Sequence, residues 1–68
     1  MKKLTVEALI NSDYDPDTNH IYLEFDVDGV TVVAVGSAPE GSFTHRDWFD
    51  HQENIDSFVK GAMVEERG

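Results

Sequence analysis

The clearest pattern along the chain is a strict alternation of apolar and polar side chains in residues 20–28. Ile21, Leu23, Phe25 and Val27 are apolar, and the residues between them are polar or acidic. A period of two residues is typical of a strand that buries one face and exposes the other. We therefore predict a strand here, with a buried face and an acidic outer face.

The pair Asp28-Gly29 follows that strand and lies between Val27 and Val30, where a second largely apolar segment begins. A two-residue type I′ turn needs positive φ at both central positions, and Asp-Gly tolerates this, so the pair predicts a tight hairpin. A two-residue loop also determines the register of the two strands. The predicted pairs are Val27 with Val30, Phe25 with Val32 and Leu23 with Ala34 on the core face, and Asp26 with Thr31, Glu24 with Val33 and Tyr22 with Val35 on the outer face.

A second hairpin is predicted around residues 15–19. Proline after aspartate suits a type I turn, and Asn19 tolerates the left-handed conformation that closes it. The first strand of this hairpin would cover residues 4–14, although residues 5–10 could also start a short helix. The side chains expected to point inward from this strand are Leu4, Val6, Ala8 and Ile10.

The period changes in the last third of the chain, which predicts a helix. Thr44 and Asp47 have the spacing of a capping box, and Phe43 precedes them as one half of a hydrophobic staple with Trp48. A break of the helix near Asn54 is an alternative. The residues that form one helical face, at spacings of three and four, are Trp48, Gln52, Ile55, Val59 and Ala62.

These elements predict an α+β fold in one small domain spanning residues 1–68. The expected architecture is a three-stranded antiparallel β-meander in residues 4–37, with one C-terminal helix in residues 43–66 packed on one of its faces. A chain of 68 residues is too short for a second domain.

The charge of the chain says more about its partner than the fold pattern does. The chain carries 14 acidic and 5 basic side chains, and residues 4–45 contain no lysine or arginine but eight of the acids. An acidic surface without neutralising cations repels nucleic acid and anionic lipid and attracts basic proteins. We therefore expect a basic protein surface as the partner, and no direct contact with nucleic acid or membrane.

The rest of the composition argues against a membrane-spanning or secreted protein. There is no cysteine, and the longest apolar run, 32–35, is far shorter than a membrane helix. Lys2 and Lys3 are not followed by the apolar stretch of a signal peptide. A soluble cytoplasmic protein is the expectation, in the host cytoplasm if the gene belongs to a phage.

The acidic segment 13–17 is the best metal candidate. Asp13, Asp15 and Asp17 alternate as in a calcium loop, with Glu24 at the twelfth position, but Thr18 stands where that loop requires glycine. We interpret the segment as a solvated turn capped by aspartate side chains, and we expect no metal and no cofactor.

Catalysis has little support in the sequence. The serines have no convincing base and orienting acid nearby, and the pair Asp47 and His51 is explained equally well by an exposed helical turn. The loop 36–41 contains Glu40, which would repel phosphate. We therefore expect a protein that is not an enzyme.

The predicted register makes the outer face of the hairpin acidic at its turn end and apolar at its far end, where Tyr22, Val33 and Val35 lie. Such a patch beside acids suggests a docking surface. The hypothesis is an acidic inhibitor that mimics nucleic acid and occupies the basic surface of a nuclease, a CRISPR effector or a transcription factor. The residues expected to bind the partner are Asp13, Asp15, Asp17, Tyr22, Glu24, Asp26, Asp28, Val33, Val35, Asp47 and Asp50.

Two alternatives stay open. The apolar patch could instead be the seam of a non-catalytic homo-oligomer with a structural or regulatory role, in which case the charge would serve solubility. The acidity could also be an adaptation to high salt, in which case it would say nothing about partners.

Overall fold

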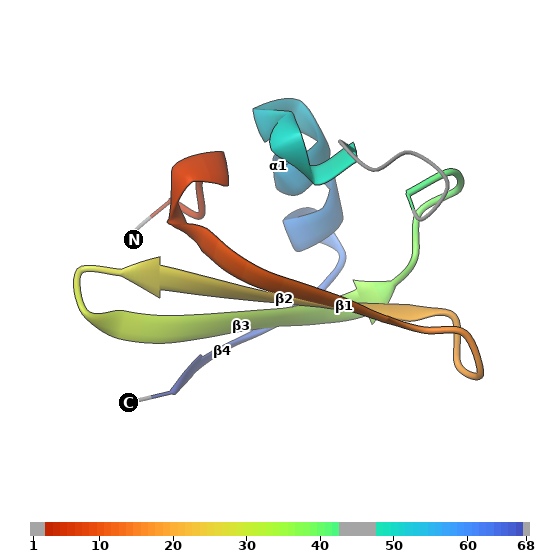
Figure 1. Ribbon diagram of the computed structural model, residues 1–68, viewed down its shortest axis with the longest axis horizontal. Helices are drawn as coiled ribbons and strands as arrows, with labels where there is room; N and C mark the ends of the chain where they lie inside the picture. The colour runs from red at the N-terminus through yellow and green to blue at the C-terminus, as the bar shows by residue number, and fades with distance from the viewer. Residues whose placement is uncertain (1–2, 43–47, 68) are drawn as a thin grey trace.

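A four-stranded antiparallel sheet with all its helices on one side forms the fold (Figure 1). The computed structural model describes residues 3–42 and 48–67. The strands lie in the order β1-β2-β3-β4. The elements along the chain are the 3-10 helix η1 (Val6–Ala8), β1 (Leu9–Asp15), β2 (His20–Val27), β3 (Val30–Ser37), the 3-10 helix η2 (Trp48–Asp50), α1 (Gln52–Lys60) and β4 (Met63–Arg67).

The hairpin of β2 and β3 confirms the prediction from alternation. Asp28 and Gly29 have φ of 53° and 82°, the positive values that a two-residue turn of this kind needs. Every predicted pair is found, from Val27 opposite Val30 at the turn to Tyr22 opposite Val35 at the far end.

The first strand is shorter than predicted, and part of its inward face is wrong. η1 occupies the start of the segment, where Thr5 Oγ1 accepts a hydrogen bond from the Ala8 N–H at 3.3 Å. Leu9 then lies opposite Phe25 and Asn11 opposite Glu24, so Ile10 is an extra residue in a bulge. Ile10 is consequently 59% exposed instead of pointing inward, whereas Leu4 is buried as expected.

The predicted C-terminal helix is divided at His51, three residues before the break that the sequence suggested near Asn54. The side chain of Asn54 donates a hydrogen bond to the Trp48 carbonyl oxygen at 2.7 Å and so ties η2 to the first turn of α1. The proposed capping box of Thr44 and Asp47, and Phe43 of the staple, lie outside the described residues.

The prediction of three strands was wrong, because the end of the supposed helical segment is a fourth strand. α1 ends at Lys60, and the Gly61 N–H donates to the Phe58 carbonyl oxygen at 3.2 Å as the chain turns back. β4 then pairs antiparallel with β3, with Glu65 opposite Val33. Its five residues are all exposed, so no buried face marked it in the sequence.

The core lies between the sheet and α1. Ile55 and Phe58 of the helix are buried against Leu23, Phe25 and Ala34 of the sheet. The fit is close under the end of the helix: a Cβ at Gly36 would lie 3.2 Å from the Cβ of Ala62, so glycine there permits the approach. We call this side of the sheet the inner face.

The side chain of Gln52 joins the N-terminal segment to the helix. Gln52 Oε1 accepts from the Val6 N–H at 3.0 Å, and its Nε2 donates to the Leu4 carbonyl oxygen at 2.9 Å. The same Nε2 donates to Asp56 Oδ1 at 2.9 Å, and Lys3 Nζ lies 3.8 Å from the other oxygen of that carboxylate.

Candidate functional site: the outer face of the sheet

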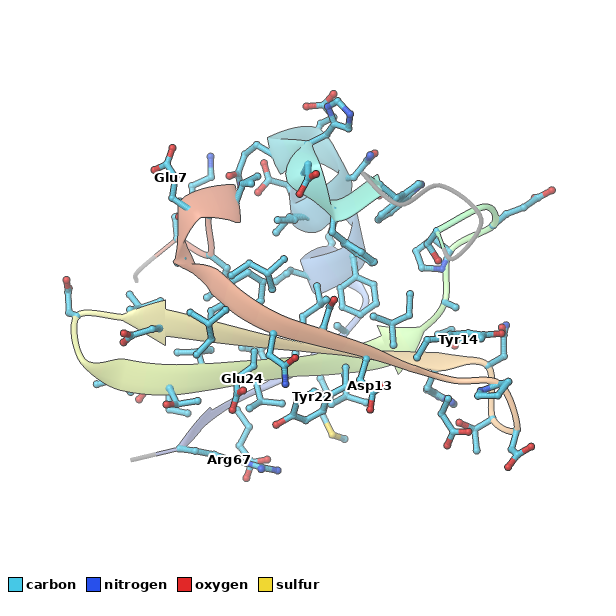
Figure 2. All side chains as sticks on the ribbon, viewed as in Figure 1. Glu7, Asp13, Tyr14, Tyr22, Glu24 and Arg67 are labelled. Atoms are coloured by element: carbon cyan, nitrogen blue, oxygen red, sulfur yellow. The ribbon has the colours of Figure 1, made fainter. Side chains whose placement is uncertain are left out.

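The side of the sheet opposite α1 has no helix of the described segments over it, and we call it the outer face. In Figure 2, Tyr22, Glu24 and Arg67 point to this side, whereas Glu7 lies with the helices on the other. Directly paired residues share a face of a sheet. The register therefore assigns to the outer face Asn11, Asp13 and Asp15 of β1, His20, Tyr22, Glu24 and Asp26 of β2, Thr31, Val33, Val35 and Ser37 of β3, and Met63, Glu65 and Arg67 of β4.

Cross-strand rows show how charge and apolar surface are arranged on this face. One row runs Asp13, Tyr22, Val35, Met63, and the next runs Asn11, Glu24, Val33, Glu65. Opposite Cβ atoms in such rows are about 4.5–5.5 Å apart. The apolar side chains therefore form the centre of the face, with carboxylates directly beside them.

The apolar centre differs from the predicted patch in one respect. Val33 is only 1% exposed although no described helix or loop covers it, so the flanking side chains of the sheet bury it. Tyr22 and Val35 are half-buried. Met63, which is 78% exposed, extends the patch onto β4. A partner would thus meet Tyr22, Val35 and Met63, with Val33 as the floor beneath them.

The acids of this face are accessible. Asp13, Asp15, Asp26 and Glu65 are exposed, and Glu24 is half-buried. Within residues 3–42 and 48–67, none of these carboxylates forms an ion pair with a lysine or arginine. The absence of cations from residues 4–45 therefore carries over to the folded surface.

β4 does add one cation to the outer face. Arg67 lies opposite Thr31, which in turn lies opposite Asp26. Arg67 is therefore at the end of β4 nearest the hairpin turn, several residues along the sheet from the rows of Asp13 and Asp15. The acidic character is therefore strongest toward β1 and β2.

Not all the predicted binding residues lie together. Asp17 is in the turn between β1 and β2, and Asp28 is in the turn at the opposite end of β2. Asp50 belongs to η2 in the helix layer, away from the outer face, and Asp47 lies outside the described residues. The residues brought together on one face are Asp13, Asp15, Tyr22, Glu24, Asp26, Val33 and Val35.

Local hydrogen bonds account for the acidic residues in and beside the turn between β1 and β2. Asp15 Oδ1 accepts from the Asp17 N–H at 3.0 Å, and the Tyr14 hydroxyl donates to Asn19 Oδ1 at 3.0 Å. Asn19 has a φ of 55°, as predicted for the residue that closes the turn. In the part of the chain that the structure describes, no three histidine, cysteine or acidic side chains are grouped to hold a metal ion.

The residues that sequence reasoning missed are Met63, Glu65 and Arg67. Their alternation with Val64 and Glu66, after Gly61, was the available signal. It was weak because both faces of this strand are exposed, so neither set of positions is consistently apolar.

No protein-family model, no curated protein and no solved structure matches this chain. None of the described helices has the length and apolar character needed to cross a membrane.

Proposed function

We propose that this protein is a non-catalytic binding module whose outer face docks on a basic surface of another protein. The observation that carries the proposal is the pattern of that face: an apolar centre of Tyr22, Val35 and Met63 lies directly beside carboxylates. An aromatic anchor surrounded by charge is the composition of many protein interfaces.

The partner that fits best is a protein that itself binds nucleic acid. The basic groove of such a protein is shaped to hold phosphates, and carboxylates held on a rigid sheet can take their place. The protein would then act as an inhibitor by competition, in the manner of phage-encoded inhibitors of nucleases or CRISPR effectors. This version of the proposal rests on the charge of the outer face and on the small size of the chain.

The same arrangement predicts how binding depends on salt. Exposed carboxylates raise the rate of association with a basic partner, and added salt screens that attraction. Apolar contact through Tyr22 and Met63 is much less sensitive to salt. We therefore expect salt to slow association strongly and to change dissociation less.

The decisive experiment compares two triple charge reversals with the same change in net charge. One variant carries Asp13→Lys, Glu24→Lys and Asp26→Lys on the outer face. The matched control carries Glu7→Lys, Asp50→Lys and Glu53→Lys, which are exposed acids of the helix layer. Proteins captured from a host lysate are compared for both variants and the original chain, and retained partners are challenged with double-stranded DNA.

We expect the original chain and the helix-layer variant to retain the same partner, and the outer-face variant to lose it. Release of that partner by DNA would support competition for a nucleic-acid site. Equal retention by both variants, with thermal melting showing that both are folded, would contradict the use of the outer face.

The exposed apolar residues of β4 favour a second candidate, a structural or regulatory homo-oligomer. Met63 and Val64 are 78% and 46% exposed, and a second copy could cover them. A symmetric contact through the outer face would, however, bring like charges together. Sedimentation at tens of micromolar separates the two proposals, because only the oligomer predicts a mass above that of one chain.

A further inference from the structure

β4 forms one edge of the sheet. Among the described strands it pairs with β3 alone, and Figure 1 shows it at the margin of the sheet. A strand with one neighbour points half of its backbone N–H and C=O groups outward, where they can pair with another strand. All five residues of β4 are exposed, so this edge is accessible in the described part of the molecule.

An aliphatic groove borders the same strand on the inner face. Its volume is about 510 Å³, within the range of known binding pockets. Val64 and Glu66 of β4 line it, and the other charged residues in its lining are Lys3, Asp56 and Lys60. The aliphatic residues of the groove are Leu4, Val27, Val30, Val32, Val59 and Val64.

The groove lies beside the helix, toward the hairpin turn. Ile55 and Phe58 of α1 are buried against the inner face, whereas Val27 and Val30 next to the turn are only half-buried.

We propose that an extended segment of the partner adds to the sheet beside β4, and that this segment alternates long aliphatic and basic side chains. Alternate side chains of a strand point to opposite faces. The aliphatic ones would pass over Val64 into the groove, and the basic ones would lie beside Glu65 on the outer face. The basic half of this pattern rests on the proposed function, whereas the aliphatic half rests on the groove.

Charge argues against a second copy of this chain at the same edge, because each copy carries a formal net charge of −9. One register illustrates this. An antiparallel pair of β4 strands centred on Glu65 would place that carboxylate opposite itself and Val64 opposite Glu66. Like charges directly opposite each other destabilise a strand pair. A basic side chain beside Glu65 turns that repulsion into attraction.

The opposite edge of the sheet is a poorer acceptor. β1 is interrupted by the bulge at Ile10, which disturbs the row of backbone groups that a new strand would need. No residue of β1 lines the aliphatic groove. The two edges therefore differ in both backbone regularity and side-chain support, and this difference supplies the control for the experiment.

The test uses a synthetic peptide of about nine residues, enough to span β4, with alternating lysine and leucine and blocked ends. A second peptide of the same composition carries its lysines and leucines in two separate blocks. Binding is measured by calorimetry, and hydrogen exchange of the amides of β4 is followed by NMR. We expect the alternating peptide to bind more tightly and to slow exchange of those amides.

Two single substitutions locate the site. Val64→Glu should weaken binding of the alternating peptide roughly tenfold or more, because a carboxylate would then replace the aliphatic side chain over which the leucines pass into the groove. Ile10→Glu makes the same change at an exposed position on the other edge and should leave binding nearly unchanged. Thermal melting of both variants checks that the fold is retained.

Three results would overturn the inference. One is binding without protection of the β4 amides, and another is an equal effect of both substitutions. The third is a dimer in sedimentation whose β4 amides are already protected without peptide. The first would leave the proposed function standing if the variant Asp13→Lys, Glu24→Lys, Asp26→Lys no longer bound the peptide, because the contact would then lie on the outer face.

Discussion

The two faces of the sheet bury apolar side chains in different ways. On the inner face Phe25 is buried beneath a helix, whereas on the outer face Val33 is equally buried by the side chains of its own sheet. The inner residues belong to one continuous core, and Val33 does not. A helix shields the inner face from water, whereas the side chains of the sheet itself shield Val33. Under the proposed function those side chains move aside when the partner docks, so burial would serve stability on the inner face and recognition on the outer face.

The largest expected effect contrasts an aromatic side chain on each face. Phe25→Ala should lower the free energy of unfolding by about 3–5 kcal/mol, because the helix above the cavity can collapse only partly. Tyr22→Ala on the same strand should lower it by only about 1 kcal/mol, since that side chain is half-buried. Urea unfolding followed by circular dichroism measures both.

A comparable loss of stability in the two variants would break this contrast. It would mean that the outer face is as tightly packed as the core. Phe25→Leu serves as the milder inner-face variant if the alanine variant does not fold.

An intermediate effect on stability is expected where Gln52 anchors the helix layer to the N-terminal segment. Gln52→Ala removes the side-chain hydrogen bonds to the backbone of Leu4 and Val6, so the free energy of unfolding should fall by about 1–3 kcal/mol. Ser57→Ala, an exposed position on the same helix, should stay within about 0.5 kcal/mol. Chemical unfolding of both variants provides the comparison.

Amide exchange sharpens the result for Gln52. The N–H of Val6 should exchange faster in Gln52→Ala, while the amides in the middle of β2 and β3 keep their order of protection. Uniform loss of protection would show that Gln52 supports the whole fold and not this junction alone.

The smallest effect concerns charge on the outer face. Glu24→Gln removes one carboxylate from the outer face. Among the described residues, the acids of this face form no ion pair with a lysine or arginine. Repulsion falls, so stability should rise by a few tenths of a kcal/mol at low salt and less at high salt. Thermal melting at two salt concentrations measures the difference, and a decrease at low salt would contradict it.

Particular residues show how far sequence could anticipate the site. The alternation in residues 20–28 and the pair Asp28-Gly29 predicted the β2–β3 register and hence the positions of Tyr22, Glu24 and Val35. Ile10 was misplaced because a bulge inserts one residue, which a strict period of two cannot represent. Met63 and Glu65 were missed because β4 is exposed on both faces and resembles the end of a helix.

The sequence alone determined the central hairpin, because a two-residue turn and an alternating pattern specify local pairing without help from the rest of the chain. It also determined that the face of that hairpin would be acidic. Tertiary structure decided that β4 completes the sheet and that Val33 is a buried floor. These features depend on contacts between distant segments, where β3 meets both α1 and β4, and side-chain periodicity carries no information about such partners.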